Sequence, residues 1–193
     1  MNNFSYIYEI KGEANISHIN EGPHEKEGIL FKLHNSDYSQ KYSEIRGIIT
    51  IKNKNQMAVD IPFIFRKESK LMLIITAFNN HKLTAVNFFN SHIKGKLMPF
   101  IPNISREYKL LCESFKTVTA SLFKNGEIID SSDEEIDICE TNLQEFELLD
   151  AVLYMASKRI VFYYYRNALM FAPNTKDEDM ELVFQKFEET MLN

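Results

Sequence analysis

The chain has 193 residues, of which 45% are hydrophobic and 12% aromatic, so it is expected to bury a sizeable core and fold as a globular protein. Its longest apolar run, Leu71 to Ala77, is far shorter than the roughly 20 residues that a membrane-spanning helix needs. The first residues lack the basic and apolar regions of a secretory signal. We therefore expect a cytoplasmic protein without a membrane partner.

Charge is divided unequally along the chain. Residues 1–126 contain 17 Lys and Arg against 11 Asp and Glu, a net charge of +6, whereas residues 127–193 contain 5 against 16, a net charge of −11. The two values sum to the −5 of the whole chain. A basic surface attracts polyanions and an acidic surface attracts cations and basic proteins, so this division bears on the choice of partner.

The sequence from Ile45 to Phe89 predicts a β-meander. Side chains alternate across a strand with a period of two, and one face of the second strand is entirely apolar. Its residues are Met57, Val59, Ile61, Phe63 and Phe65. Folding the first strand back over a tight turn at Asn53–Asn55 pairs Ile49 with Val59 and Ile45 with Phe63. A second turn at Glu68-Ser69-Lys70 sets Leu73 opposite Phe65, and a fourth strand is expected from Leu83 to Phe89.

The other face of this predicted sheet is too apolar to be wholly open to water, because it would show Ile48, Ile64, Met72 and Ile74. We expect part of it to be covered. The candidates are the amino-terminal strands, Phe4 to Ile10 and Gly28 to Leu33, or one of the later helices.

An apolar segment between two prolines, Leu97 to Pro102, predicts a boundary after which the pattern becomes helical. One helix is expected from Ser105 to Leu122, ending at Asn125-Gly126, and another follows the capping box that begins at Thr141 and runs to Ala156. The remaining elements expected here are a short strand at Ile128-Ile129, a hairpin of residues 160–165 and 169–172, and a last helix beginning at Thr175 with an apolar stripe of Met180, Val183, Phe184, Phe187 and Met191.

These patterns predict an α+β protein. Its antiparallel β-meander lies in the N-terminal half, residues 1–102, and is packed by C-terminal helices and a small hairpin from residues 103–193. The second half also holds the acidic segment, and we expect the two halves to form one compact unit.

The acidic segment is a candidate surface for a basic partner. Its carboxylates are Asp133, Glu134, Glu135 and Asp137. A calcium loop of the helix-loop-helix type would need ligands at alternate positions and a central glycine, and this segment has neither. The alternative interpretation is a solvated loop whose charges repel one another.

A loose match to the Asp…Glu-x-Lys pattern of metal-dependent nucleases begins at Asp60 and continues with Glu68-Ser69-Lys70. In such a site two carboxylates hold Mg²⁺ and the lysine orients the attacking water. Three common charged residues also occur together by accident, and the predicted register puts them in a hairpin turn. We therefore expect no metal and no cofactor.

Cations cluster at the strand ends and turns of the meander. Those that would form a phosphate-binding rim are Lys52, Lys54, Arg66, Lys67 and Lys70. Lysine is common in hairpin turns for solubility alone, and the chain's pI near 5.6 argues against strong nonspecific affinity for nucleic acid.

The run from Phe162 to Tyr165 places aromatic residues on both faces of one strand, so Tyr163 and Tyr165 are candidates for a contact surface. The leading prediction is a non-catalytic cytoplasmic interaction or regulatory protein. It would dock another protein, or a second copy of itself, through its acidic C-terminal region and these tyrosines. The alternative is a nucleic-acid-binding protein or metal-dependent nuclease that uses the basic rim of the N-terminal sheet.

Overall fold

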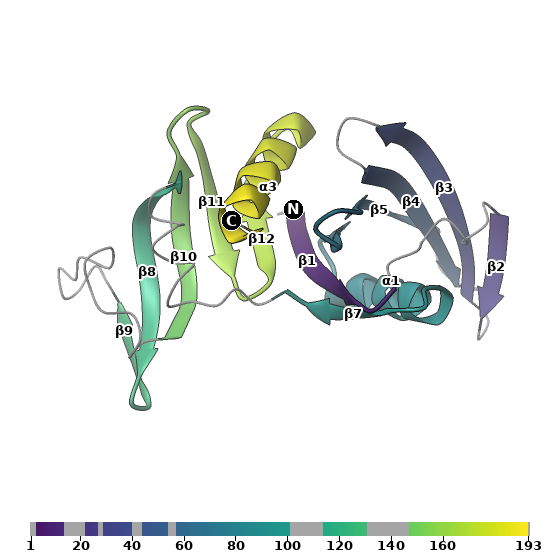
Figure 1. The fold of residues 1–193 in the computed structure, drawn as a ribbon, viewed down its shortest axis with the longest axis horizontal. Helices are drawn as coiled ribbons and strands as arrows, with labels where there is room; N and C mark the ends of the chain where they lie inside the picture. Colours follow the sequence, from purple (N-terminus) through teal and green to yellow (C-terminus); the bar gives the residue numbers. More distant parts are fainter. Residues whose placement is uncertain are drawn as a thin grey trace. The chain divides into compact units, whose positions relative to one another are not determined.

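A computed structural model describes residues 3–13, 22–26, 29–39, 44–53, 57–100, 114–130 and 147–192. The chain divides into two compact units, Phe4–Phe100 and a unit formed by Met1–Asn3 with Ile101–Asn193. We call them the N-terminal and the C-terminal unit. Each contains antiparallel strands and a helix, so the α+β class predicted from the sequence is confirmed (Figure 1). None of the described helices has both the length and the apolar character needed to cross a membrane.

The N-terminal unit contains a meander of antiparallel strands, as predicted, and a helix follows these strands. The spatial order is β2-β3-β4-β5-β6-β1, and β7 also pairs with β1. The elements are β1 (Asn3–Lys11), β2 (Gly22–Lys26), β3 (Ile29–Ser39), β4 (Glu44–Asn53), β5 (Val59–Arg66), β6 (Leu71–Ile75), α1 (Asn79–His92) and β7 (Lys96–Pro99).

The helix α1 replaces the fourth strand that was predicted from Leu83 to Phe89. Its buried side chains, Ala85, Phe88 and Phe89, recur at the three- and four-residue spacing of a helix. Phe89 packs edge-on against Phe63 of β5, with 5.0 Å between ring centroids. The apolar residues of this short segment fit both a strand and a helix, because periodicity does not distinguish the two in short apolar runs.

The pairing of β4 with β5 differs from the predicted register by two residues. Ile49 lies opposite Ile61, and Ile45 lies opposite Phe65. Because a shift of two residues preserves the side-chain alternation, the predicted apolar face survives. Met57, which was predicted to belong to that face, instead precedes β5 and is 90% exposed.

The pairing of β5 with β6 differs from the prediction by one residue. The turn between Arg66 and Leu71 has four residues, and its last one, Lys70, has a φ of 55°. A one-residue shift exchanges the two faces of a strand. Met72 and Ile74 consequently lie on the face that packs against α1, where Leu73 was predicted.

The amino-terminal strands extend the sheet instead of covering it. β1 pairs with β6, and β3 pairs with β4. On the face opposite α1 the side chains of Ile7, Ile64 and Leu73 are nonetheless buried, in keeping with the apolar character predicted for that face.

The C-terminal unit contains antiparallel strands in the spatial order β12-β11-β10-β8-β9. Its elements are β8 (Lys116–Lys124), β9 (Glu127–Asp130), β10 (Glu147–Met155), β11 (Ile160–Tyr165), β12 (Ala168–Phe171) and α3 (Asp177–Leu192). The predicted hairpin, the short strand at Ile128-Ile129 and the last helix are confirmed.

Two helices predicted in this unit are mostly strands where the structure describes them, although Ser114, within the first of them, is helical. Residues 116–122 belong to β8, and residues 147–155 belong to β10; residues 105–113 and 141–146 lie outside the described residues. Asn125 and Gly126, both with positive φ, form a two-residue turn between β8 and β9. Asn-Gly is the preferred sequence for such a hairpin turn, and here it forms that turn and not the end of a helix.

The helix α3 packs on one face of this sheet, which we call the inner face (Figure 1). Met180, Val183, Phe184 and Phe187 of its apolar stripe are buried, and the ring of Phe187 lies 5.8 Å from that of Tyr164 in β11. Both units therefore contain three consecutive antiparallel strands followed by a helix, β4-β5-β6-α1 and β10-β11-β12-α3.

Candidate functional site

The sheet of the C-terminal unit has two different faces. On the inner face, Ala151, Leu153, Phe162 and Leu169 are at most 1% exposed. The opposite face, which we call the outer face, is apolar and aromatic but is only partly buried. Its described residues are Thr119, Ser121, Phe123, Ile128, Asp150, Val152, Tyr154, Val161, Tyr163, Tyr165 and Met170.

Several apolar side chains of the outer face are open to solvent. Val161 is 53% exposed, Tyr165 42% and Ile128 69%. Single exposed apolar residues are normal on a protein surface, whereas a contiguous set on one sheet face is typical of an interaction site. Val161 and Tyr165 lie on β11 and Ile128 on β9, and the outer-face residues of β10 and β8, such as Val152 and Phe123, lie between them.

Two tyrosines lie side by side at the centre of the outer face. Tyr163 and Tyr165 are two residues apart in β11 and so point to the same side, and their rings are parallel within 6° with 6.4 Å between centroids. The guanidinium of Arg166, in the turn after β11, lies 5.2 Å from the ring centroid of Tyr165. The chain itself therefore places a cation on this aromatic surface.

A carboxylate completes this cluster. Asp150 of β10 lies opposite Tyr165 in the ladder and is hydrogen-bonded to the Tyr163 side chain, whose phenol is the donor. Partial burial, followed by the charge of Asp150 and this hydrogen bond, raises the pKa of Tyr163 above its usual value near 10. The phenol therefore stays protonated at neutral pH and remains a hydrogen-bond donor.

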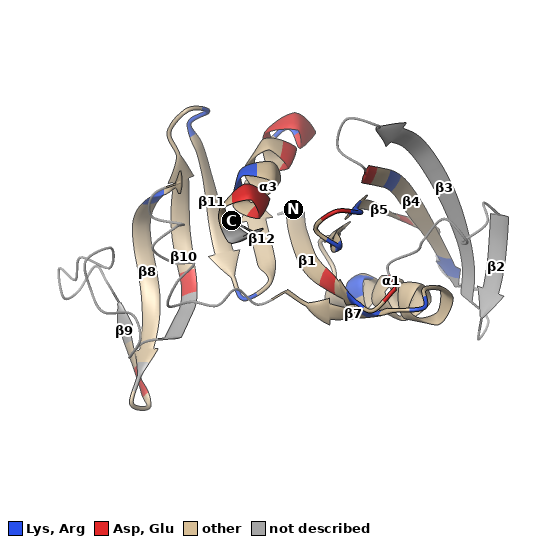
Figure 2. Ribbon diagram, in the orientation of Figure 1, with Lys and Arg blue, Asp and Glu red and all other residues tan. Residues whose placement is uncertain are grey.

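Lys and Arg residues lie at the hairpin end of β10 and β11, and residues of both signs lie at the other end of these strands (Figure 2). Lys116, which pairs with Tyr154, and the turn residues Lys158 and Arg159 lie at one end and are exposed. Asp150 and the cation Arg166 lie toward the other end. The exposed Glu127 pairs with Lys124 and therefore lies on the side of the sheet opposite to Ile128.

Of the partner-binding residues predicted from the sequence, the structure describes the two tyrosines, and both lie on the outer face. Asp133, Glu134, Glu135 and Asp137 lie outside the described residues.

The cations predicted to form a phosphate-binding rim have different surroundings. Lys52 and Lys70 are exposed, Lys67 is half-buried, and Lys54 lies outside the described residues. Arg66 is 5% exposed and does not share a surface with the exposed lysines.

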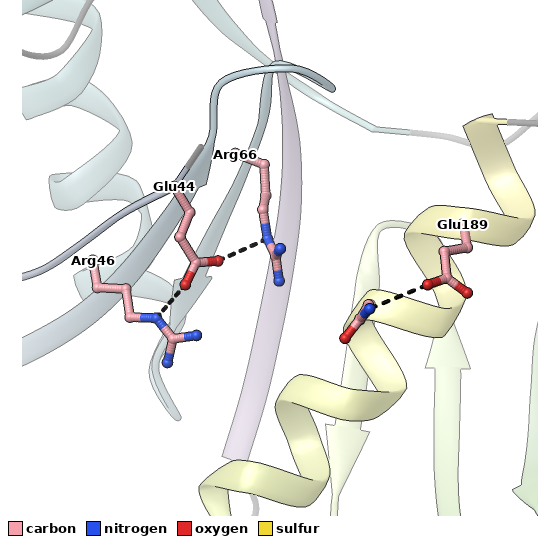
Figure 3. A network of polar contacts seen from close by, with 5 residues as sticks. Glu44, Arg46, Arg66 and Glu189 are labelled. Atoms are coloured by element: carbon pink, nitrogen blue, oxygen red, sulfur yellow. Dashed lines mark hydrogen bonds and ion pairs between the residues drawn. The ribbon is translucent and has the colours of Figure 1, made fainter. Parts of the chain in front are cut away.

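Arg66 belongs instead to a buried cluster of charges (Figure 3). It lies opposite Glu44 in the β4–β5 ladder, and its Nε is 3.1 Å from a carboxylate oxygen of Glu44. The other carboxylate oxygen lies 2.6 Å from Nε of Arg46, which is about one-third exposed. The Glu44 side chain is fully buried, so two guanidiniums compensate for its loss of water.

The residues of the nuclease-like pattern do not gather in one place. Asp60 accepts a hydrogen bond of 2.6 Å from the hydroxyl of Thr50 near the start of β5, whereas Glu68 and Lys70 lie in the turn after its end. At about 3.3 Å per residue, the intervening strand separates the two positions by roughly 25 Å. Within the described part of the chain, no group of three or more His, Cys, Asp and Glu residues could hold a metal ion.

A smaller exposed cluster lies at the beginning of α1. Phe78 is 48% and Leu83 50% exposed, and Nζ of Lys82 lies 4.4 Å from the ring centroid of Tyr6. Burial lowers the pKa of Lys82 and raises that of Tyr6. Substitutions of these exposed apolar side chains can therefore serve as controls for substitutions in the outer face.

Sequence reasoning missed most of the outer face because it placed β8 and β10 in helices. Phe123, Val152 and Tyr154 were assigned no surface role, and Asp150 was not considered. The Asn125-Gly126 pair was the signal that could have found β8. Comparison with known proteins finds no family model that matches this sequence and no significant match among curated proteins.

Proposed function

We propose that this chain is a non-catalytic interaction protein of the cytoplasm, with a regulatory role, that docks another protein through its C-terminal unit. The observation that carries the proposal is the outer face, where Val161, Tyr165 and Ile128 remain exposed while Ala151, Leu153, Phe162 and Leu169 of the inner face are buried. An exposed apolar surface of this kind is stabilised when a partner removes it from water.

The composition of the outer face supports this role. Tyrosine is enriched at protein interfaces because its ring supplies a large contact area and its hydroxyl keeps a hydrogen bond. Tyr163 and Tyr165 are already held parallel by the pleat of β11, so little side-chain entropy is lost when a partner packs on them. The net charge of −11 over residues 127–193 adds attraction for a partner with basic groups.

The first test replaces exposed side chains of the outer face. The double variant Val161→Ser/Tyr165→Ser removes apolar contact area without changing charge, and Phe78→Ser/Leu83→Ser is the matched control on α1. Each tagged chain is expressed in its native host, cross-linked and purified, and the copurifying proteins are identified by mass spectrometry. We expect partners of the wild type to be retained by the control and lost from the outer-face variant. Identical partners for all three chains would contradict the proposal.

A second arm tests the acidic segment. Changing Asp133 and Asp137 to Asn, and Glu134 and Glu135 to Gln, removes four negative charges. The partner found in the first arm should then bind more weakly at low salt, and its binding should depend less on ionic strength, because fewer charges are screened. Equal affinity and equal salt dependence for this variant and the wild type would exclude the segment from the interface.

A further inference from the structure

We infer that the protein docked on the outer face presents an acidic segment, which lies over a cluster of cations at the hairpin end of β10 and β11. This basic cluster consists of Lys116, Lys158 and Arg159. The inference rests on the proposed function and names the chemistry of its partner.

The three cations lie close together at one end of the outer face. Lys116 pairs with Tyr154 in the ladder of β8 and β10, and the turn that carries Lys158 and Arg159 begins directly after Met155. Strands lie about 4.8 Å apart and rise about 3.3 Å per residue, so the backbones of the three residues lie within roughly 15 Å of one another. One short segment of a partner can therefore contact all three side chains.

The basic cluster lacks a counterion in the part of the chain that the structure describes. Its three side chains are exposed, and none of them forms an ion pair with another described residue. By contrast, Lys11, Lys94 and Lys186 each pair with a glutamate. A carboxylate from a partner can therefore approach the cluster without displacing a described carboxylate of this chain.

The hairpin end of the outer face selects the sign of the partner's charge. At the other end the carboxylate of Asp150 and the guanidinium of Arg166 both lie beside the tyrosines, so their charges offset one another. The hairpin end carries cations alone among the described residues (Figure 2). Lys158-Arg159 is also the only pair of adjacent cations among residues 127–193, whose net charge is −11.

The surroundings of the basic cluster favour an acidic protein segment over nucleic acid. Every nucleotide carries a phosphate, and a long polyanion would be repelled by the net charge of −11 over residues 127–193. A protein segment can instead concentrate a few carboxylates over the cluster and continue with apolar side chains. Val161, which lies beside Tyr154 in the next strand and is 53% exposed, offers the contact for the first of these.

The strand geometry sets the order of residues in the partner. Side chains on one face of β11 recur about every 6.6 Å, so Val161, Tyr163 and Tyr165 lead away from the basic cluster in that order. A segment that lies along β11 would place its acidic residues over the cluster and its apolar residues over this row.

The test finds ligands by selection and then changes the charge of the basic cluster. Random short peptides are displayed and selected on the full-length wild-type chain, and the selected peptides are synthesised. Fluorescence anisotropy measures their Kd at several salt concentrations for the wild type and for Lys158→Glu/Arg159→Glu. Lys52→Glu/Lys96→Glu is the control, because it makes the same charge change at exposed positions of the N-terminal unit.

We expect the selected peptides to be rich in Asp and Glu next to apolar residues. Their Kd should rise at least about tenfold in Lys158→Glu/Arg159→Glu and change by no more than about twofold in the control, because like charges then meet only at the cluster. Peptides in which Lys replaces each Asp and Glu should show the reverse preference and bind Lys158→Glu/Arg159→Glu more tightly than the wild type. That recovery also shows that this variant is folded.

The variant Val161→Ser/Tyr165→Ser separates failure of this inference from failure of the proposed function. Selected peptides that are lost from this variant, yet contain no excess of Asp and Glu and bind Lys158→Glu/Arg159→Glu as tightly as the wild type, would overturn the inference and leave the docking role standing. A selection that yields no peptide sensitive to either variant would contradict both.

A labelled oligothymidylate in the same assay tests the other class of polyanion. If it binds the wild type but not Lys158→Glu/Arg159→Glu, while no acidic peptide is selected, the basic cluster binds nucleic acid and the inference is wrong.

Discussion

Tyr163 shows how one side chain on an open surface acquires a specific chemical state. Its phenol donates to Asp150, and its ring lies parallel to that of Tyr165. In addition to partial burial, the charge of Asp150 and the Coulombic interaction with Tyr165 disfavour the phenolate of Tyr163.

This arrangement predicts a pH dependence. Because the pKa of Tyr163 is raised in the folded state, the folded chain binds more protons than the unfolded chain above pH 10, and stability falls as pH rises through that range. Asp150→Asn should lower the pKa of Tyr163 and reduce this fall, since the charge is lost. NMR titration of labelled tyrosine, assigned with Tyr163→Phe, measures the shift. Glu127→Gln is the control, and a pKa unchanged by Asp150→Asn would refute the assigned cause.

Glu44 is the residue whose loss should destabilise the N-terminal unit most directly. Glu44→Ala leaves Arg66 buried without its carboxylate, and breaking a buried pair in this way costs about 3–5 kcal/mol. The exposed pair of Glu9 and Lys11 provides the control, and Glu9→Ala should cost less than about 1 kcal/mol.

Urea unfolding of each variant measures the difference, and Glu44→Met/Arg66→Met should recover much of the loss because no unpaired charge remains. Similar stability for Glu44→Ala and Glu9→Ala would mean that the buried cluster contributes little.

Among the elements, the junction of α1 and β7 is the most tightly packed connection. Asn90 in α1 accepts a hydrogen bond of 2.7 Å from the backbone N–H of Leu97 in β7. Between them, Gly95 lies so close to β1 that a Cβ would come within 2.7 Å of the Lys11 carbonyl oxygen and 2.8 Å of Ile10 Cγ2. Only glycine fits there, because one of these contacts is backbone and does not rotate away.

Gly95→Ala should therefore destabilise the chain by about 1–3 kcal/mol through overpacking. Lys96→Ala, an exposed substitution at the next position, should change stability by no more than about 0.5 kcal/mol. Thermal unfolding followed by circular dichroism compares the two. Equal midpoints would show that β1 and β7 move apart at low cost.

The elements that were predicted correctly are those whose pattern excludes an alternative. The stripe of α3 recurs only with a helical period, and the hairpin of β11 and β12 is short and bounded by Arg166-Asn167. β10 allowed both interpretations, because Leu149, Val152 and Leu153 fit a helix while Ala151, Leu153 and Met155 fit a strand. In the structure Val152 of β10 pairs with Thr119 and Tyr163 on the neighbouring strands. Pairing with residues so far away in the sequence cannot be predicted from the segment alone.

At the scale of the whole molecule, the sequence pointed to Tyr163 and Tyr165 as candidates for a contact surface but did not predict the outer face on which they lie. Tyr163 and Tyr165 could be assigned to one face because alternate residues of a strand point to the same side. Phe123 and Ile128 join them only through the ladders of β8 and β9. The shared order of three strands and a helix was likewise not visible as a sequence repeat, because different residues form the buried faces of the two helices, such as Phe88 and Phe89 in α1 and Val183 and Phe184 in α3.

The four-residue turn before β6 has a consequence for how this chain reaches its native state. Every residue of β6, from Leu71 to Ile75, is apolar, so a strand that slipped by a single position would still place hydrocarbon on both sides. Hydrophobicity alone therefore does not reject the slipped arrangement. Discrimination depends on the left-handed conformation at Lys70 and on the packing of β6 against the buried side chains of α1. We expect a deletion in that turn to favour the slipped pairing.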